Sequence, residues 1–452
     1  MDCFAIARND MNATTTTQTI YALATPQGKG GVAVLRISGP NARTALAHVG
    51  VAATPAPRMA TLATLQHGGR VIDQALVLYF AAPHSFTGDD VVELHLHGGV
   101  AVMRAAMDAL ASCPGLRVAE PGEFTRRAFL NNKLDLAQAE GLADLIDAQT
   151  SAQHRQALRQ LGGEGSRRVA ALREQVLAPL ALLEAYIDFP DEEIPESVLA
   201  ETTARVAALA HELAQLLNDG GLGEKIREGL EIVILGPPNA GKSSLLNALA
   251  KRDAAIVSDE AGTTRDMVEV HLELAGFEVT LVDTAGLRDA AGSIEAEGIR
   301  RARARAEQAD FKLVLLDGAT AAADYPAIAP LLDDTATLVL TKADLGAAPA
   351  LPHAALSLST TTGEGMEALI AAIRQRVETL MESAPAPLIT RARHREALRE
   401  AYALLQHWHM DKPLELACEE LRAAAVSLGK ITGKIWVDDI LDLVFSRFCI
   451  GK

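Results

Sequence analysis

The sequence predicts a multidomain α/β plus α protein, in which a parallel α/β domain is inserted into a mostly helical chain. Three observations predict this arrangement. The chain has 452 residues, which is more than one hydrophobic core usually serves. Strand and helix patterns alternate over residues 229–380, as is typical of a mostly parallel sheet with helices on both faces. On either side, apolar residues recur at the spacing of amphipathic helices.

The composition is that of an ordinary folded protein. Hydrophobic residues make up 49% and charged residues 22% of the chain, and no apolar run approaches the roughly 18–20 residues that span a bilayer. The first residues lack the apolar segment of a signal peptide. Cys3, Cys113, Cys418 and Cys449 are far apart, which argues against disulfides and zinc. We therefore expect a cytoplasmic protein without a membrane partner. Its net charge of −16 argues against a general nucleic-acid coat but allows a local basic patch.

Residues 20–120 carry strand patterns, and helix patterns begin near Phe124. Two later apolar stripes predict the core of a helical bundle, and Pro190 and Pro195 interrupt the chain between them. The predicted strands span 32–37, 75–80 and 91–96. The stripes consist of Val169, Leu172, Val176, Leu180, Leu183 and Ile187, and of Val206, Leu209, Leu213 and Leu216.

The inserted region begins after the glycines at 220–223, and helix patterns return after residue 387. Apolar strand patterns are separated by turns and by one helix pattern, which predicts a βαβ arrangement. The predicted strands span 230–235, 268–274, 277–282, 311–317 and 336–341, and the predicted helix spans 243–251.

A phosphate-binding loop lies between the first strand and the helix of this region. Residues 236–243 read GPPNAGKS and match the pattern G-x-x-x-x-G-K-[ST]. Its glycines let backbone N–H groups surround phosphates, Lys242 reaches the β- and γ-oxygens, and the Ser243 hydroxyl binds Mg²⁺. Because the loop follows a strand and opens a helix, it has the context that this motif requires.

Three further segments follow in the order expected of a Ras-like GTP site. Residues 262–266 (GTTRD) offer Thr264 as a second hydroxyl for Mg²⁺, and residues 283–286 (DTAG) place Asp283 near the metal and the Gly286 N–H near the γ-phosphate. In residues 341–344 (TKAD), Asp344 would accept hydrogen bonds from N1 and N2 of guanine. Adenine does not offer these two donors, so this contact would select GTP over ATP. Residues 359–361 (STT) give a weaker signal for a loop that supports the base. The motifs predict these GTP-binding residues: Asn239, Ala240, Gly241, Lys242, Ser243, Ser244, Gly262, Thr263, Thr264, Asp283, Thr284, Ala285, Gly286, Thr341, Lys342, Ala343, Asp344, Ser359 and Thr360.

The residue after the DTAG segment is Leu287, whereas Ras-type sites place a water-positioning glutamine there. A leucine cannot orient a nucleophile, so hydrolysis requires a polar residue from 288–297. Asn239 lies inside the phosphate loop, where its carbonyl oxygen suits a monovalent cation that would stabilise transition-state charge. The polar candidates in the segment are Arg288, Asp289, Glu295 and Glu297.

Together with other segments, these motifs make the chain resemble the bacterial and organellar tRNA-modification GTPases of the MnmE or TrmE family. The resemblance runs from about Thr19 to Lys452. It is carried by residues 24–32 (ATPQGKGGV), 35–39 (LRISG), 120–135 (EPGEFTRRAFLNNKLD), 236–243, 261–266 (AGTTRD) and 448–452 (FCIGK).

The resemblance implies four segments and a defined activity. Residues 13–131 would form a folate-binding, aminomethyltransferase-like dimerisation domain, 132–228 and 381–452 a helical domain, and 229–380 the inserted GTPase domain. Family members act as homodimers with the flavoprotein MnmG (GidA), in a heterotetramer. They install an aminomethyl or carboxymethylaminomethyl group at C5 of the wobble uridine of certain tRNAs. The one-carbon unit comes from a tetrahydrofolate derivative, a 5-formyl or methylene form.

Family site residues carry over to matching positions of this sequence. The implied potassium ligands are Asn239, Ser258, Glu260 and Thr263, and Asp259 and Ala261 join them in the GTP site. The implied magnesium ligands are Ser243 and Thr264. The implied catalytic residues are Lys242, the water-orienting Glu295 and the C-terminal Cys449, and the implied folate contacts are Arg36, Glu93, Lys133 and Lys452. The sequence departs from the family at Thr341, where asparagine is usual, at Lys29 for arginine, and at residues 95–97 (HLH).

Other interpretations remain open. The arginine-rich run at 300–305 fits a solvated helix face or a tRNA contact, and Cys449 fits a packed small hydrophobe. A GTP-controlled RNA or ribosome assembly factor would share the GTP motifs, although such proteins usually carry a basic RNA-binding module. A folate-binding protein with a purely structural GTPase domain is a third possibility, which a GTPase assay with and without potassium would separate.

Overall fold

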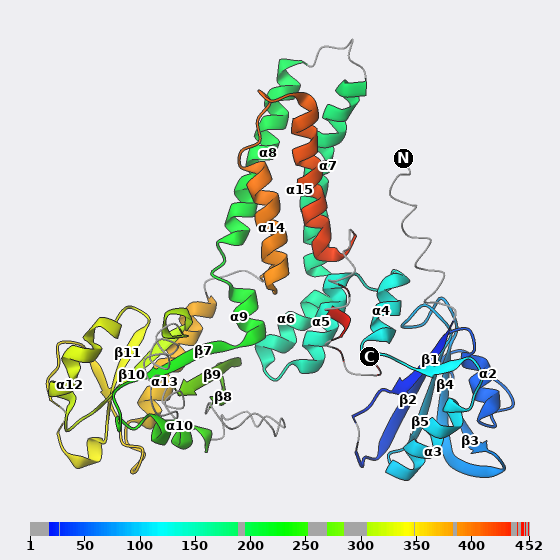
Figure 1. Cartoon of the computed structure of the whole chain (residues 1–452), viewed down its shortest axis with the longest axis horizontal. Helices are drawn as coiled ribbons and strands as arrows, with labels where there is room; N and C mark the ends of the chain where they lie inside the picture. The colour runs from blue at the N-terminus through cyan, green and yellow to red at the C-terminus, as the bar shows by residue number, and fades with distance from the viewer. Residues whose placement is uncertain are drawn as a thin grey trace, which may run out of the picture. The chain divides into compact units, whose positions relative to one another are not determined.

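The computed structural model describes residues 18–26, 28–188, 195–251, 269–283, 305–347, 349–382, 387–434, 441, 444–446, 448 and 451. The chain forms two compact units (Figure 1). One consists of Met1–Ala143, Gln160–Leu177 and Ala425–Lys452, and the other of Asp144–Arg159 and Ala178–Ala424. The inserted α/β domain lies within the second unit.

The first unit is built on a six-stranded sheet with the strand order β3-β4-β5-β2-β1-β6. Neighbouring strands are antiparallel except β1 and β6, which are parallel. Alternate residues of the strands pack against α2 and α3 and form one core, which includes Leu35, Val77 and Leu94. The bounds are β1 (Thr19–Leu23), β2 (Val32–Ser38), α2 (Ala42–His48), β3 (Thr61–His67), β4 (Arg70–Phe80), β5 (Val91–His97), α3 (Val100–Ala111) and β6 (Leu116–Val118).

The opposite face of this sheet is only partly covered. Phe124, on α4 (Glu123–Leu130), packs against Ile20 and Ala22 of β1. Arg36 of β2 and Glu93 of β5 are register partners, and they differ by one residue from the core-facing Leu35 and Leu94. Because side chains alternate across a strand, both charged residues lie on this second face.

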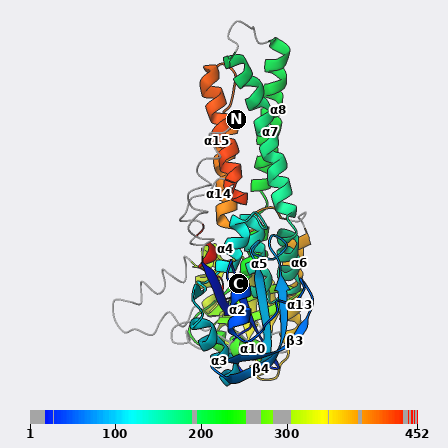
Figure 2. The same ribbon diagram turned by 90° about the vertical axis from the view of Figure 1, so that its right-hand side faces the viewer.

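Both apolar stripes form helices with buried cores, which confirms the helix prediction. Val169, Leu172 and Val176 are buried on α7, and Val206 and Leu209 on α8. In the second unit, α8 packs against α14, and these helices run alongside α7 and α15 (Figures 1 and 2). The bounds are α5 (Leu136–Asp147), α6 (Ser151–Leu161), α7 (Glu164–Asp188), α8 (Glu196–Leu217), α9 (Leu222–Glu228), α14 (Ala392–Leu405) and α15 (Leu414–Thr432).

The inserted domain contains a second six-stranded sheet, with the order β12-β11-β10-β7-β9-β8. All its neighbouring strands are parallel except β8 and β9, which form an antiparallel hairpin. The bounds are β7 (Leu230–Leu235), α10 (Lys242–Ala250), β8 (Glu269–Leu274), β9 (Phe277–Asp283), β10 (Phe311–Asp317), α12 (Ala321–Ile328), η2 (Ala329–Leu331), β11 (Ala336–Thr341), η3 (Ala343–Leu345), β12 (Ala355–Ser357) and α13 (Met366–Glu382).

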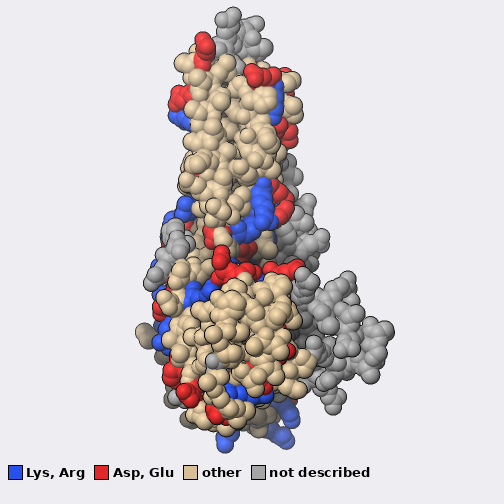
Figure 3. Space-filling view, turned by 90° about the vertical axis from the view of Figure 1, so that its left-hand side faces the viewer, with Lys and Arg blue, Asp and Glu red and all other residues tan. Residues whose placement is uncertain are grey.

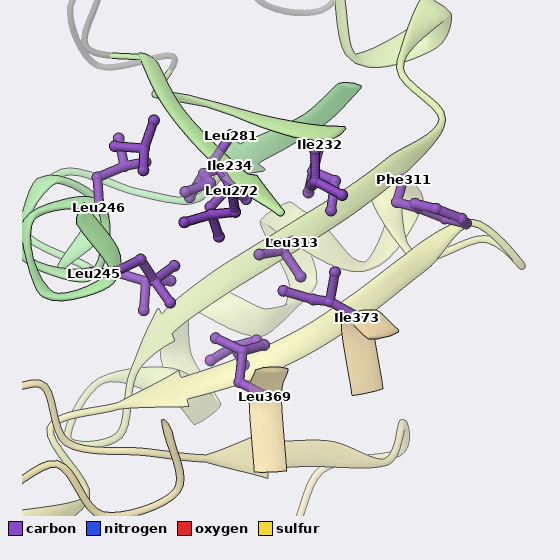
Figure 4. Close-up of a cluster of buried hydrophobic side chains, with 14 of the residues drawn as sticks. Ile232, Ile234, Leu245, Leu246, Leu272, Leu281, Phe311, Leu313, Leu369 and Ile373 are labelled. Carbon is purple, nitrogen blue, oxygen red and sulfur yellow. The ribbon is translucent and has the colours of Figure 1, made fainter. Parts of the chain in front are cut away.

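Two hydrophobic clusters cover the two faces of this sheet. On one face, Leu245 and Leu246 of α10 and Leu369 of α13 approach strand residues such as Ile234 and Leu313 (Figure 4). On the other face, Ala321 and Ile328 of α12 pack against a separate set of strand residues. The sequence predicted this layered arrangement, and the bounds of β7, β10 and β11 agree with those predicted.

The β8–β9 hairpin is attached to the helical part of the second unit. The N–H of Ala152, in the first turn of α6, donates a hydrogen bond to the Gly276 carbonyl (3.0 Å). Gln153 Nε2 donates to Glu278 Oε2 (2.7 Å) and to the Arg227 carbonyl (3.2 Å). Among the described residues, no helix has both the length and the apolar character that a bilayer span requires.

Candidate functional site

The phosphate-binding loop joins β7 to α10. Gly236 has φ = +147° and Gly241 has φ = +88°, conformations that favour glycine. A Cβ at Gly236 would lie 2.3 Å from the Leu315 carbonyl oxygen of β10, so a side chain there would displace the loop from the sheet. The loop therefore enters α10 with its N-terminal N–H groups available, which is the geometry that binds phosphate.

Lys242, at the first position of α10, is buried against the loop that it follows. Its ammonium donates hydrogen bonds to the carbonyl oxygens of Gly236 (2.8 Å) and Pro237 (2.9 Å). The positive charge of Lys242 therefore lies against the loop, where it can pair with phosphate oxygens. Ser243, the predicted magnesium ligand, follows on the first turn and is exposed.

Asn239 occupies an unusual position in the same loop. Its φ is +64°, a left-handed conformation that asparagine tolerates better than most residues. The side chain is exposed and forms no hydrogen bond with a residue that the structure describes. The amide oxygen is therefore available to an external ligand beside the phosphate site.

Thr341, the first residue of the predicted guanine-recognition segment 341–344, is hydrogen-bonded to the phosphate loop. The residue is 2% exposed, and its hydroxyl donates to the carbonyl of Ala240 (2.8 Å), with the Leu316 carbonyl at 3.2 Å. Threonine thus supplies a donor to the loop from the position where most G proteins carry asparagine. The sequence motif gave no indication of these two acceptors, because they come from β10 and the phosphate loop.

Asp344 lies in η3, shortly after Thr341 in the chain. Its carboxylate is exposed and has no hydrogen-bond or ion-pair partner in the described part of the chain, so it is free to accept the two N–H donors of guanine. The preceding Lys342 has φ = +58° and donates to Asp317 Oδ2 (2.7 Å). This hydrogen bond lowers the pKa of the Asp317 carboxyl and fixes Lys342 at the end of β10.

The loop that begins at Ser359 is held beside Asp344. The Ala343 N–H donates to the Leu358 carbonyl (3.1 Å), which joins the two segments. Ser359 is fully buried, and its hydroxyl oxygen accepts hydrogen bonds from the N–H groups of Thr361 and Thr362 (both 3.2 Å). The structure therefore brings together the phosphate loop, Thr341, Asp344 and the loop at Ser359 and Thr360.

Several predicted site residues lie outside the described residues. Asp283 ends β9, and its backbone pairs with Ile234 of β7, just before the phosphate loop, but its side chain is outside the described part. The others are Ser258, Asp259, Glu260, Ala261, Gly262, Thr263, Thr264, Thr284, Ala285, Gly286, Glu295, Cys449 and Lys452.

A second constellation surrounds Arg36 and Glu93 on the partly covered face of the first sheet. Arg36 Nε donates to Glu93 Oε1 (2.9 Å), and His95 Nε2 lies 3.3 Å from Glu93 Oε2. The Arg36 guanidinium lies over the rings of Phe86 (5.6 Å) and Phe124 (5.8 Å). No sequence motif assigned His95 or either ring to a site. His95 is on β5, Phe86 lies between β4 and β5, and Phe124 is on α4, so only the tertiary fold brings them to Arg36.

The C-terminal tail closes on this constellation. Arg36 Nη1 donates to the Gly451 carbonyl (3.4 Å). A Cβ at Gly451 would lie 2.1 Å from the Leu23 carbonyl, so the tail backbone packs directly on β1. Phe445 and Phe448 are buried with Phe129 and anchor the tail. Gly451 lies in the sequence between the predicted residues Cys449 and Lys452, which are outside the described residues.

Lys133 lies elsewhere in the first unit, in the turn between α4 and α5. It is exposed and lines a cavity of about 290 Å³ together with Asn132, Gln138 and Lys434. The lining of this cavity includes neither Arg36 nor Glu93 among the described residues. The structure therefore groups Arg36, Glu93 and the tail, and places Lys133 in a separate depression.

The fold and the first site define a P-loop GTP-binding protein of the Ras-like class. Two sequence profiles cover most of the chain: "GTP-binding protein TrmE N-terminus" matches residues 19–133 and "MnmE helical domain" matches residues 136–449. The chain therefore belongs to the MnmE family of tRNA modification GTPases, and its activity is GTP hydrolysis in tRNA modification.

Relatives match over nearly their whole length. The tRNA modification GTPase MnmE of Parvibaculum lavamentivorans is 51% identical over 441 residues, which cover 96% of this chain and 100% of that protein. The protein of the same name from Paramagnetospirillum magneticum is 50% identical over 444 residues, with 96% and 100% coverage. Among solved structures, the G domain of the T. maritima FeoB iron transporter aligns at 22% identity, over 33% of this chain and 98% of that one, with a TM-score of 0.25.

Proposed function

We propose that this protein is a potassium-activated GTPase that acts with a flavoprotein of the MnmG type. Together they add an aminomethyl or carboxymethylaminomethyl group to C5 of the wobble uridine of certain tRNAs. GTP hydrolysis drives the cycle, and a tetrahydrofolate derivative supplies the one-carbon unit. The observation that carries this proposal is the separate Arg36–Glu93 constellation closed by Gly451, because a simple GTP-controlled assembly factor has no need of a second ligand site.

The Arg36–Glu93 constellation fits a reduced folate. The pyrimidine ring of a tetrahydropterin is planar and has N–H donors along one edge. Glu93 offers a carboxylate to such an edge, and Phe86 and Phe124 flank the guanidinium with flat apolar surfaces. When bound, the folate would supply the one-carbon unit, while Arg36 and Glu93 orient it and the tail limits access of water.

Asn239 supports the potassium part of the proposal. Its free amide oxygen lies in the phosphate loop, next to the Ala240 carbonyl that Thr341 holds. Because Leu287 cannot position water, charge stabilisation by a bound cation and a polar residue from the segment that contains Glu295 would replace the missing glutamine. Ser243 and Thr264 would hold Mg²⁺ beside it.

A homodimer is supported by the edge of the first sheet. Leu62 of β3 and Leu76 of β4 are register partners, and they are 71% and 39% exposed. Val71 of β4 is also exposed. Adjacent exposed aliphatic side chains on a sheet are typical of a protein interface, and a second copy of this chain would cover them.

Mass spectrometry of wobble uridines from cells that lack this protein tests the proposal. We expect the C5-modified nucleosides to disappear from the affected tRNAs and to return when the wild-type gene is restored. Normal modification in the deletion strain, with retained GTP hydrolysis by the purified protein, would favour the assembly-factor alternative instead.

A further inference from the structure

Helix α6 carries an exposed basic face in a chain that is acidic overall. Its 11 residues, SAQHRQALRQL, contain two arginines and a histidine but no carboxylate. The whole chain, in contrast, has 58 acidic residues against 42 lysines and arginines. The positive charge of α6 is therefore opposite in sign to the net charge of the chain.

The two faces of α6 differ completely in their surroundings. Ala152, Gln153 and Ala157 are buried, and Gln156 Nε2 donates to the Gly223 carbonyl of α9 (2.9 Å). These residues hold α6 against α9 and the β8–β9 hairpin. The basic residues His154, Arg155 and Arg159 lie on the opposite, exposed face.

The spacing of these basic residues places them together. Arg155 and Arg159 are four residues apart, so they lie on adjacent turns of one face, about 6 Å apart along the helix axis. His154 and the 45% exposed Leu158 continue the same face. Neither guanidinium has a hydrogen-bond or ion-pair partner in the described part of the chain.

Local electrostatics does not account for this pair. A cation in the last turn of a helix interacts favourably with the helix dipole, which would explain Arg159. Arg155 lies outside that last turn, and like charges four residues apart destabilise a helix. An external polyanion would remove this repulsion.

The sequence left a tRNA contact open for the run at 300–305, but Arg305 is unavailable for such a partner. Its guanidinium is paired with Glu231 (2.8 Å) and Glu269 (3.2 Å) of the inserted domain. Residues 300–304 lie outside the described residues. Acidic and basic side chains are interspersed on the face of the molecule that Figure 3 shows, so the negative net charge does not prevent a local contact with RNA.

We propose that the exposed face of α6, through His154, Arg155 and Arg159, binds the phosphate backbone of tRNA. The inference rests on tRNA as the substrate of this protein. The guanidinium groups of Arg155 and Arg159, on adjacent turns, can each bind one of two successive phosphates of a strand. Leu158 lies on the same face and offers an apolar contact to a ribose. Phosphate contacts carry no sequence information, so this face would position the tRNA rather than select it.

The test is a titration of the full-length chain with an unmodified tRNA transcript, at constant KCl and several NaCl concentrations. Arg155→Gln/Arg159→Gln removes two charges from the face. We expect tRNA binding to weaken by roughly tenfold, and the slope of log K against log salt to become shallower by about 1–2. GTP hydrolysis without RNA should match wild type.

The matched control is Arg104→Gln/Arg374→Gln, which removes two other exposed arginines without described partners. It should leave affinity and slope unchanged. Arg155→Lys/Arg159→Lys keeps the charge and should keep the slope, which separates charge from any effect on folding.

The inference is overturned if the glutamine pair binds tRNA like the control pair. It is also overturned if that variant keeps its tRNA affinity but loses an acidic protein partner, because the face would then serve protein docking. Failure of the wild-type chain to bind tRNA would instead count against the proposed function, so the two failures are distinguishable.

Discussion

Replacing Thr341 by valine removes one hydroxyl from the GTP site and keeps the shape of the side chain. That hydroxyl donates to the Ala240 carbonyl of the phosphate loop (2.8 Å) from a residue that is 2% exposed. Losing a buried hydrogen bond and leaving its acceptor without that donor costs about 1–2 kcal/mol. If this hydrogen bond holds the loop in its phosphate-binding conformation, the lost free energy raises the Kd for GTP by roughly 5- to 30-fold.

Thr341→Ser is the matched control, because it keeps the donor and removes one methyl group, which is worth about 0.8 kcal/mol of burial. Titration with a fluorescent GTP analogue measures affinity, and a thermal melt measures stability. Thr341→Val should bind GTP more weakly than Thr341→Ser. The reverse order, or valine binding within about twofold of wild type, would show that packing and not the hydroxyl positions the loop.

Four other predictions concern the two sites, the C-terminal tail and the buried Glu123. GTP hydrolysis should be roughly 10²–10³ times faster in potassium than in sodium, the factor typical of one transition-state charge partner; equal rates would exclude a cation at Asn239. Asp344→Asn should weaken GTP and favour xanthosine triphosphate in competition binding, and unchanged GTP affinity would show that another residue recognises the base. Cys449→Ser should abolish wobble-uridine modification in cells while leaving potassium-stimulated hydrolysis near normal; intact modification would show the thiol to be dispensable. Burial alone would raise the pKa of Glu123, but hydrogen bonds from Arg117, the Glu120 N–H and Arg127 outweigh it, and the net pKa is lowered. Glu123 therefore stabilises the fold above its unfolded pKa, and this contribution is lost as pH falls through the lower folded value. Acid unfolding should accordingly be less pH-dependent in Glu123→Gln, and identical pH profiles would contradict the assignment.

The sequence predicted the inserted domain better than the first unit. Strands β7, β10 and β11 are nearly continuous apolar runs because they are buried on both faces, and such runs have clear ends. Strand β3 exposes alternate residues such as Leu62 and has no apolar run. Helix α2 is short and α3 is rich in alanine, and neither was predicted.

The site residues show a similar division. Contiguous motifs predicted Lys242 and Asp344, and local backbone geometry determines where the structure places them: Lys242 against the phosphate loop and Asp344 in η3. The hydrogen bond from Thr341 to Ala240 joins residues 101 positions apart. The pairing of Arg36 with Glu93 depends on strand register, and Phe86 reaches Arg36 from the segment between β4 and β5. Such long-range contacts are properties of the tertiary fold, and a pattern in one sequence does not encode them locally.

The contact between Arg36 and Gly451 has a consequence for biosynthesis. The two residues are 415 positions apart in the chain, and the whole inserted domain is made between them. A nascent chain can fold its first sheet early, since domains generally fold as units during synthesis. It cannot complete the constellation around Arg36 until residue 451 has left the ribosome. A truncated product could therefore contain a finished GTPase domain, but its first site would lack the tail. Completion of that site thus reports that the chain has been translated to residue 451.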